Sequence, residues 1–325
     1  MASGLQVMAT TLWRQFTQAV WPMDSAVQAH GPILSAQQIT QLATELTQLA
    51  VRLPANIHSS QALRQGEQRS RFMGAGLEYA ESRPYQLGDE IRRIDWRMMA
   101  KTGKAFTKLY QEERQESLFI LLDHRQTMRF GTRTRIKAEQ ALRAAGYYLW
   151  MAQQTGTPVE GARLAESLVY TPTFEGRAIF EQLMNRFSQP CPPLKNSSVE
   201  PHLNDVLLDL MQRIQPGSRV VLISDFHDLN KNSVEIFTAL QQLADVQAVW
   251  IQDPAERELP SQSGVQLQSM VDGQRYAISS SKESDLYRTW SSDFFSKQTN
   301  RLKASGINVK VLSSDDPLTV LQAGE

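Results

Sequence analysis

The run Ser117-Leu118-Phe119-Ile120-Leu121-Leu122-Asp123 decides the fold of this chain. Its apolar residues form a continuous block of the length expected for a strand that is buried on both faces. An aspartate ends the block, and the polar loop His124-Arg125-Gln126-Thr127 leads from it into a helical pattern. Ligands of open α/β sheets bind beyond the carboxyl ends of the parallel strands. This order of apolar strand, aspartate, polar loop and helix therefore predicts a central parallel strand with a site at its carboxyl end.

A second stretch farther along the chain has the same design. Arg219-Val220-Val221-Leu222-Ile223-Ser224 is an apolar run, and Asp225 follows it directly. The carboxyl ends of parallel strands lie at one edge of their sheet. We therefore expect Asp123 and Asp225 to share one site.

Strand-like and helix-like patterns alternate from Ser117 to the last residue. This alternation predicts an α/β fold with a mainly parallel sheet and helices on both of its faces. The expected helices cover 134–154, 175–187, 203–214, 233–243 and 282–305. The expected further strands cover 159–165, 168–171, 246–252 and 308–312, with a hairpin over 266–278.

The residues before Ser117 divide into two parts. Residues 35–53 have apolar side chains at helical spacing after a capping Ser35, and a polar linker follows up to residue 69. Short extended runs between glycines then predict a small β unit. The expected organisation is an N-terminal helical segment with linker (1–69), a small β-rich region (70–116) and the α/β domain (117–325).

Composition excludes several classes of protein. The 34 basic and 34 acidic side chains balance, so net charge gives no reason to expect a nucleic-acid partner. One cysteine provides neither a disulfide framework nor a set of zinc ligands. The sequence lacks an apolar run of roughly 18 residues that would span a bilayer, and its first residues lack the pattern of a signal peptide. These features predict a soluble, cytoplasmic protein without an integral membrane span.

The residues around the two strand ends resemble the metal-ion-dependent adhesion site of von Willebrand factor A domains. That site has the form Asp-x-Ser-x-Ser, with a distant threonine and a distant aspartate. Asp123 matches the first aspartate, Thr127 the second hydroxyl and Asp225 the late aspartate. However, Arg125 replaces the first serine, and a guanidinium has no acceptor to offer magnesium. The place of the distant threonine reads Glu200-Pro201-His202.

Two interpretations of this site remain open. Arg125 could replace the ion, because its planar fork can bridge two carboxylates such as those of Asp123 and Asp225. The alternative is a working magnesium site that captures an acidic residue of a partner. We favour the degenerate site, without a metal or other cofactor, because a buried unpaired charge is costly and Arg125 supplies the pairing.

A second resemblance lies in the small region. Residues 88–96 read Gly-Asp-Glu-Ile-Arg-Arg-Ile-Asp-Trp and follow Arg83-Pro84-Tyr85. This segment resembles the signature of the bacterial domain-of-unknown-function family number 58, whose members join it to a von Willebrand A-like domain. The resemblance extends to residues 223–226 and 315–318.

The same segment can also be interpreted without the family. Acidic and basic side chains alternate closely in it, and we expect them to pair with one another as a structural scaffold around Trp96. These side chains are Asp89, Arg92, Arg93 and Asp95.

The family resemblance implies a function. Its members are commonly encoded beside MoxR-type AAA+ ATPases, in pairs that look like chaperone systems. It therefore implies a non-catalytic adaptor that contacts the ATPase and a client protein through the loops of Asp123, Arg125, Thr127 and Asp225. The chain has no Gly-x-x-x-x-Gly-Lys-Ser/Thr loop, so ATP chemistry would belong to the partner.

The alternative function is a magnesium-dependent hydrolase that uses the same cleft. His124 and His227 each follow a site aspartate closely, and imidazoles assist such chemistry. The chain has neither His-x-x-x-His nor Glu-x-x-His spacing, and no serine lies in a Gly-x-Ser-x-Gly elbow. We therefore expect no enzyme, and we expect both histidines to line an interaction surface.

Overall fold

The structure is a computed structural model. It describes residues 31–51, 73–86, 91–111, 117–191, 200–259, 266–268, 275–277 and 281–322. The chain divides into two compact units, a larger one of residues 1–51 and 116–325 and a smaller one of residues 52–115. The N-terminal helix thus belongs to the larger unit and is not part of a separate segment of residues 1–69.

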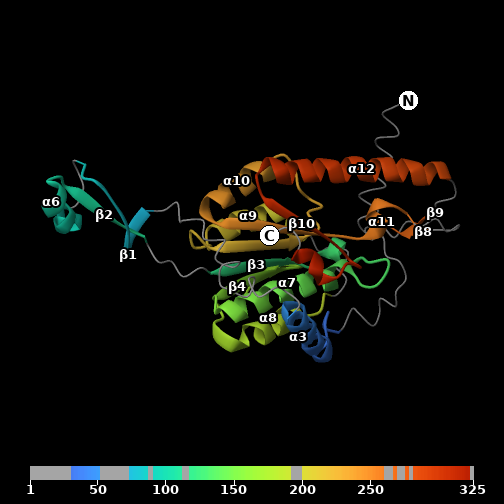
Figure 1. The fold of residues 1–325 in the computed structure, drawn as a ribbon. Coiled ribbons are helices and arrows are strands. Elements are labelled where there is room, and N and C mark those ends of the chain that lie inside the picture. The colour runs from blue at the N-terminus through green and yellow to red at the C-terminus, as the bar shows by residue number, and fades with distance from the viewer. Residues whose placement is uncertain are drawn as a thin grey trace. The chain divides into compact units, whose positions relative to one another are not determined.

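The larger unit is a mixed α/β fold around a mainly parallel six-stranded sheet (Figure 1). The strand order is β10 (Asn308–Ser313), β7 (Asp245–Gln252), β6 (Arg219–Ser224), β3 (Leu118–Asp123), β4 (Val159–Leu164), β5 (Leu168–Tyr170). β3 lies between β4 and β6 and is parallel to both, whereas the edge strand β5 is antiparallel to β4. The expected α/β fold with a mainly parallel sheet is therefore confirmed.

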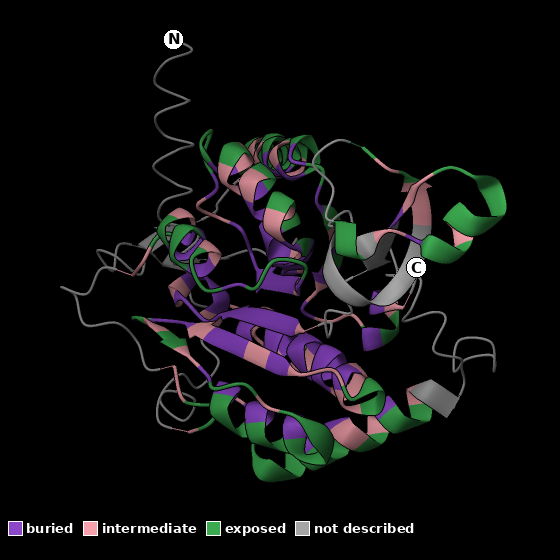
Figure 2. Cartoon of the chain, turned by 90° about the vertical axis from the view of Figure 1, so that its left-hand side faces the viewer, coloured by how far each residue is buried: buried purple, intermediate pink, exposed green. Residues whose placement is uncertain are grey.

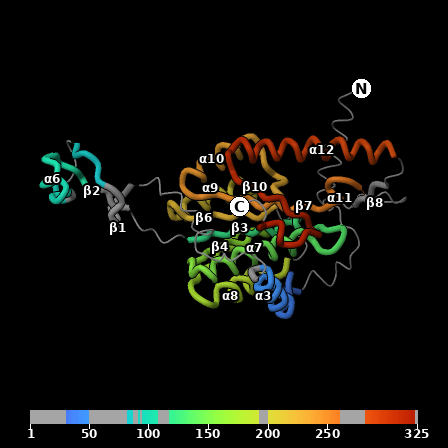
Figure 3. The backbone as a smooth tube through the Cα atoms, in the orientation of Figure 1, coloured from blue at the N-terminus to red at the C-terminus, as the bar shows by residue number. Residues whose placement is uncertain are grey.

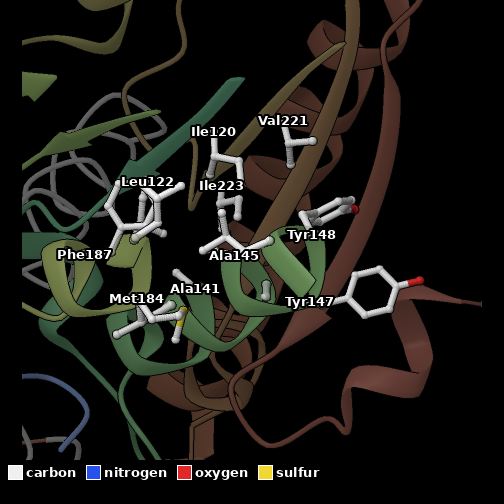
Figure 4. Close-up of a cluster of buried hydrophobic side chains, with 14 of the residues drawn as sticks. Ile120, Leu122, Ala141, Ala145, Tyr147, Tyr148, Met184, Phe187, Val221 and Ile223 are labelled. Atoms are coloured by element: carbon white, nitrogen blue, oxygen red, sulfur yellow. The ribbon is translucent and has the colours of Figure 1, made fainter. Parts of the chain in front are cut away.

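Side chains that alternate along the strands supply two cores. Ile120, Leu122, Val221 and Ile223 face one layer of helices, as Figure 4 shows. Phe119, Leu121, Val220 and Leu222 face the other layer. The first layer comprises α3 (Ala36–Val51), α7 (Lys137–Thr155) and α8 (Ile179–Phe187). The second comprises α9 (Leu203–Met211), α10 (Ser233–Leu243) and α12 (Ser281–Ala304). Burial on both faces explains why β3 and β6 have unbroken apolar sequences.

Helix α3 begins where its sequence predicts. The backbone N–H of Ser35 donates to Gln38 Oε1 at 2.8 Å, and the backbone N–H of Gln38 donates to Ser35 Oγ at 3.3 Å. This reciprocal pair satisfies two N–H groups at the start of the helix. The buried face of α3 contains Leu42 and Leu46, which belong to the core formed by α7 and α8. The helix is therefore a structural part of the sheet unit.

Shorter elements complete the larger unit. They are the 3-10 helices η2 (Gln126–Arg129), η3 (Gly176–Ala178) and η4 (Leu318–Leu321), the short helix α11 (Pro254–Arg257) and the strands β8 (Gln266–Gln268) and β9 (Arg275–Ala277). β8 and β9 pair antiparallel, so they form the hairpin expected over residues 266–278. Figure 2 shows the buried sheet at the centre of this unit and the exposed outer faces of its helices.

The smaller unit is a hairpin with a short helix. Strand β1 (Met73–Pro84) pairs antiparallel with β2 (Phe106–Gln111), and η1 (Ile91–Arg93) and α6 (Trp96–Thr102) lie between them along the chain (Figure 3). We expected only short strands here, so α6 is an element that the glycine pattern concealed. Asp95 caps its first turn, and Gly103 ends it with a φ of 70°, which glycine adopts without strain.

Among the residues that the structure describes, no helix has the length and apolar character needed to cross a membrane.

Candidate functional site

Adjacent strands bring the two predicted carboxylates to one edge of the sheet. Asp123 ends β3, Asp225 follows β6, and both side chains are buried. The strands are joined at this edge by Ser224, whose hydroxyl donates to Asp123 Oδ2 at 2.6 Å. Phe226 has a φ of 49°, in the left-handed region that is rare for a bulky residue. Its fully buried ring holds the chain in this sharp turn after β6.

Arg125 bridges two carboxylates, but the second one is not Asp225. Its Nε and Nη2 donate to Asp123 at 2.8–3.2 Å, and its Nη1 donates to Asp228 Oδ2 at 2.5 Å. Nη1 also donates to the carbonyl oxygen of Pro201 at 3.1 Å. The predicted bridge to Asp225 is therefore wrong. The turn at Phe226 places Asp228 in front of the guanidinium, and Asp225 has a cation of its own.

That cation is Lys137, the first residue of α7. Its Nζ donates to Asp225 Oδ2 at 2.8 Å and to Glu256 Oε1 at 2.5 Å, and the side chain is only 1% exposed. Glu256 reaches the lysine from α11, where its other oxygen accepts from the backbone N–H of Asp253. Sequence patterns missed Lys137 and Glu256, because lysine and glutamate in the first turn of a helix are usually solvated.

The pKa values in this cluster follow from burial and from Lys137. Burial alone would raise the pKa of Asp225, but Lys137 and His227 outweigh it and hold that pKa well below its usual value. Burial raises the pKa of Glu256 despite the same lysine. The pKa of Lys137 is raised, because its two acidic partners outweigh desolvation. Lys137 is thus a permanent cation beneath Asp225.

Charges also govern the neighbouring pair. Burial would lower the pKa of Arg125, but Asp123 and Asp228 raise it well above its usual value. Burial would raise the pKa of Asp228, but His227 and Arg125 lower it to about 2. Both members of the Arg125–Asp228 pair therefore stay charged over the whole physiological range of pH.

His227 is a partly exposed histidine of the site. Its Nδ1 lies 2.9 Å from Asp225 Oδ1 and 3.1 Å from Thr127 Oγ1, and its side chain is 24% exposed. Burial would lower the pKa of this imidazole, but the charge of Asp225 raises it. Thr127 is therefore part of a polar network with His227 and Asp225.

His124 does not lie on an interaction surface, contrary to our expectation. The side chain is fully buried, and its Nδ1 accepts a hydrogen bond from Arg163 Nε at 3.2 Å. Burial, reinforced by the charges of Arg163 and Arg129, lowers its pKa well below the usual value. His124 is therefore a neutral core residue. His124 and His227 both lie close to a strand end in the sequence, so this position did not predict that one would be buried and the other partly exposed.

Glu200-Pro201-His202, at the position of the distant threonine of the adhesion site, contacts the loop after β3. Both carboxylate oxygens of Glu200 accept from the backbone N–H of Gln126, at 2.8 and 2.9 Å. The backbone N–H of Leu203, the first residue of α9, donates to Asp228 Oδ2 at 2.9 Å. The loop after β6 is also held by α12, where Arg301 Nη1 donates to the carbonyl oxygen of Leu229 at 2.7 Å. The segment before α9 and helix α12 therefore both hold the loops of the site in place.

The donor set does not fit a magnesium ion as it stands. Magnesium requires near-octahedral oxygen ligands, but guanidinium and ammonium groups engage the oxygens of Asp123 and Asp225. No cluster of three or more His, Cys, Asp or Glu side chains that could hold a metal is found in the described part of the chain.

The signature residues of the smaller unit are arranged differently from the expected scaffold. Asp95 Oδ1 accepts from the backbone N–H of Met98 at 3.0 Å, and Asp95 Oδ2 accepts from Ser82 Oγ at 3.3 Å. Arg92 is exposed, and Trp96 is 59% exposed. The pairing of acidic and basic side chains that we expect around Trp96 stays a prediction. Asp89 lies outside the described residues.

The fold and the site together define an α/β domain whose strand ends carry internally paired charges. The family model described as "Protein of unknown function DUF58" matches residues 81–297. The chain belongs to this family, and the match includes parts of both compact units.

Relatives and solved structures resemble parts of this chain. The uncharacterized proteins Rv1480 of Mycobacterium tuberculosis and Mb1516 of Mycobacterium bovis are each 28% identical over 213 residues, which are 64% of this chain and 65% of theirs. This chain therefore matches just under two thirds of the length of these relatives. The conserved hypothetical protein BatB from Bacteroides thetaiotaomicron is similar over 64% of this chain and 94% of its own, with a TM-score of 0.42 and 12% identity. An aerotolerance-related membrane protein from Bacteroides fragilis is similar over 59% of this chain and 98% of its own, with a TM-score of 0.38 and 12% identity.

Proposed function

We propose that this protein is a non-catalytic adaptor of von Willebrand A-like fold, which binds other proteins through the loops at the carboxyl edge of its sheet. The observation that carries the proposal is the pairing of Arg125 with Asp123 and Asp228. A cation of the protein itself lies where a related adhesion site would use a metal ion. The site is therefore a degenerate adhesion site that needs no ion to stay folded.

The pinned loops support a role in binding. Arg125, Glu200 and Arg301 hold three segments of this edge through backbone atoms. A surface that is fixed before the partner arrives loses little conformational entropy on binding. The rim offers the polar side chains of His227 and His202, of which the second is 73% exposed.

The partner that we propose is a MoxR-type AAA+ ATPase, with a client protein as the second ligand. This step rests on the family, whose resemblance implies such a pairing, and on the lack of a phosphate-binding loop in this sequence. The adaptor would contribute binding, and the ATPase would contribute the energy of ATP hydrolysis.

The degenerate site is tested by calorimetric titration with Mg²⁺ and Mn²⁺. We expect no binding to the wild-type protein. The Arg125→Ser variant restores the pattern Asp-x-Ser-x-Thr and removes the competing cation, so we expect it to gain affinity for these ions. Arg133→Ser is the control, because Arg133 is 64% exposed and pairs with Asp315 at 3.3 Å instead of with an aspartate of the site. Micromolar binding to the wild type would refute the degenerate site and favour the hydrolase.

The partnership is tested by co-purification of the full chain with a MoxR-type ATPase of its native cell, in the presence of a slowly hydrolysed ATP analogue. We expect a complex that is weakened by Lys231→Glu, in the exposed loop after β6, and unaffected by Lys303→Glu at the end of α12. A repeated absence of any complex would contradict the proposal. Equal binding by both variants would show that the contact lies elsewhere.

A further inference from the structure

The smaller unit exposes apolar side chains that its own fold does not use. Ile91 is 66% exposed, Trp96 59% and Met99 38%. Helix α6 buries none of its residues. Single exposed apolar residues are ordinary, but three within nine residues form a patch that suggests a binding surface.

The same stretch carries a strong positive charge within a chain whose net charge is zero. Arg92, Arg97, Lys101 and Lys104 are all exposed. None of these four residues forms an ion pair with any residue that the structure describes, whereas most basic side chains at the site of the larger unit are paired. The acidic residue within the stretch, Asp95, is buried and bonded to the backbone N–H of Met98.

The two kinds of side chain occupy different faces of α6. Trp96 and Met99 are three residues apart and share one face of the helix, and Arg97 and Lys101 are four residues apart and share another. At about 100° per residue, the two faces are turned about 150° from each other around the helix axis. Ile91 and Arg92 continue the apolar and basic character into the preceding turn. The element therefore presents an apolar face and a cationic face, as an amphipathic helix does.

We propose that residues 91–104 bind the surface of an anionic lipid bilayer. Such a surface offers an apolar layer directly beneath negatively charged headgroups, which complements both faces of a helix that lies in the plane of this boundary. Tryptophan suits this boundary, because its ring is apolar and its N–H can stay hydrated, and long basic side chains reach the headgroups from below. A single-stranded nucleic acid could stack on Trp96, but it would leave Ile91 and Met99 without an apolar partner. A lipid surface also adapts to a short exposed helix, whereas a protein would need a matching pocket.

The proposal is tested with the full-length protein and sedimenting vesicles of two compositions. One contains equal parts of phosphatidylglycerol and phosphatidylcholine, and the other contains phosphatidylcholine alone. We expect binding to the anionic vesicles, which weakens as salt is raised, and much weaker binding to the neutral ones. Equal binding to both compositions, or no sedimentation with either, would overturn the proposal.

Charge variants locate the contact. Arg97→Glu combined with Lys101→Glu should weaken binding to the anionic vesicles at least about 30-fold, because each basic residue near such a surface contributes appreciably. The matched control is Lys231→Glu with Lys303→Glu, which makes the same charge change at exposed positions of the larger unit. Equal losses in the two double variants would overturn the assignment to residues 91–104. Unfolding curves establish that all variants are folded.

Tryptophan emission gives a second readout that net charge does not influence. Insertion of Trp96 should shift the emission of the wild-type protein to the blue when anionic vesicles are added. In Trp96→Phe the shift should be lost while most of the binding persists, and Trp96→Ser should lose much of the binding. A shift that persists in Trp96→Phe would show that another tryptophan inserts, which would overturn the role of α6.

The competing ligands are also outcomes of the test. Tight binding of an oligouridylate that Arg97→Glu with Lys101→Glu abolishes, together with no vesicle binding, would assign the surface to nucleic acid. Loss of the ATPase complex in the same variant, again without vesicle binding, would assign it to a protein. Either result would overturn the membrane proposal. The first would leave the adaptor proposal intact, and the second would move the contact with the ATPase away from the carboxyl edge of the sheet.

Discussion

Two buried cations, Arg125 and Lys137, hold the carboxyl edge of the sheet together at the scale of single residues. Each lies between two carboxylates contributed by different segments of the chain. Buried ion pairs add little net stability relative to a well-packed apolar core, because desolvation offsets their attraction. Removing one partner is costly, however, since it leaves a buried charge without compensation. These residues are therefore better explained as determinants of loop geometry than as sources of stability.

The first prediction concerns Lys137→Met, which leaves Asp225 and Glu256 facing each other without a cation. We expect the free energy of unfolding to fall by about 3–5 kcal/mol in urea titrations. Lys297→Met is the matched control. Lys297 pairs with Asp293 at 2.6 Å on the surface of α12, with both side chains more than 60% exposed, so its loss should cost at most about 1 kcal/mol. Similar losses in the two variants would contradict the special role of Lys137.

The second prediction concerns pH and His227. The groups that face its ring are Asp225 and Thr127, with the charges of Asp228 and Arg125 nearby. Because folding raises the pKa of His227, its stabilising contribution is fully present below the unfolded-state pKa of about 6.5 and is lost as pH rises through the higher folded-state pKa.

The measurement is the difference in unfolding free energy between the wild type and His227→Gln across this range of pH. We expect the difference to be largest at acidic pH and to shrink as pH rises. Taking a difference is necessary because His124 acts in the opposite direction: its pKa is lowered by folding, so its effect on stability is unfavourable at acidic pH. A difference that does not depend on pH would show that Asp225 does not stabilise the protonated ring.

At the scale of elements, α3 fits α7 through a close approach at Gly146. A Cβ atom at Gly146 would lie 2.9 Å from Leu42 Cδ2 and 3.3 Å from Met184 Sδ. The absence of a side chain on α7 therefore lets the leucine of α3 reach the core. This contact ties the N-terminal helix to the sheet unit across a long stretch of sequence.

The third prediction follows from this contact. Leu42→Ala removes a fully buried side chain and should lower the free energy of unfolding by about 2–5 kcal/mol. Leu286→Ala on α12 is the control, because Leu286 is 56% exposed and its truncation opens no internal cavity. Urea titrations of the two variants should separate clearly. A small loss for Leu42→Ala would show that α3 is not part of the cooperative core.

At the scale of the whole molecule, the smaller unit is an insertion between α3 and β3. One hydrophobic core of the larger unit draws on α3, before the insertion, and on helices and strands after it, and the other core draws on elements after it. Neither core includes a residue of the described parts of the insertion, 73–86 and 91–111. We therefore expect the larger unit to fold without the insertion.

The fourth prediction tests this independence. Replacing residues 52–115 with a flexible Gly/Ser linker of equal length should keep the cooperative unfolding transition of the larger unit, with a change in free energy of within about 1 kcal/mol. Equal length keeps the entropy of loop closure similar. Intrinsic tryptophan fluorescence and circular dichroism report the transition. Loss of cooperative unfolding would show that the insertion contributes to the core.

The sequence by itself determined which elements form and where the site lies. Apolar blocks with period two or 3.6 are local signals, so the strands ending at Asp123 and before Asp225, and the helix after Ser35, could be predicted closely. The alternation of strands and helices implied a mainly parallel sheet, which placed both aspartates at one edge. Even α6 had a local signal in Asp95 and Gly103, although the surrounding glycines obscured it.

Only the tertiary structure decided which charges pair. Arg125 bonds Asp228 instead of Asp225 because the turn at Phe226 sets the position of the residues after β6. Lys137 and Glu256 meet because α7 and α11 converge under that turn, although they are far apart in sequence. Ion pairs depend on distances of a few ångströms and on desolvation. When several charged side chains lie close together, the spacing of residues along the chain determines neither these distances nor the desolvation of each charge.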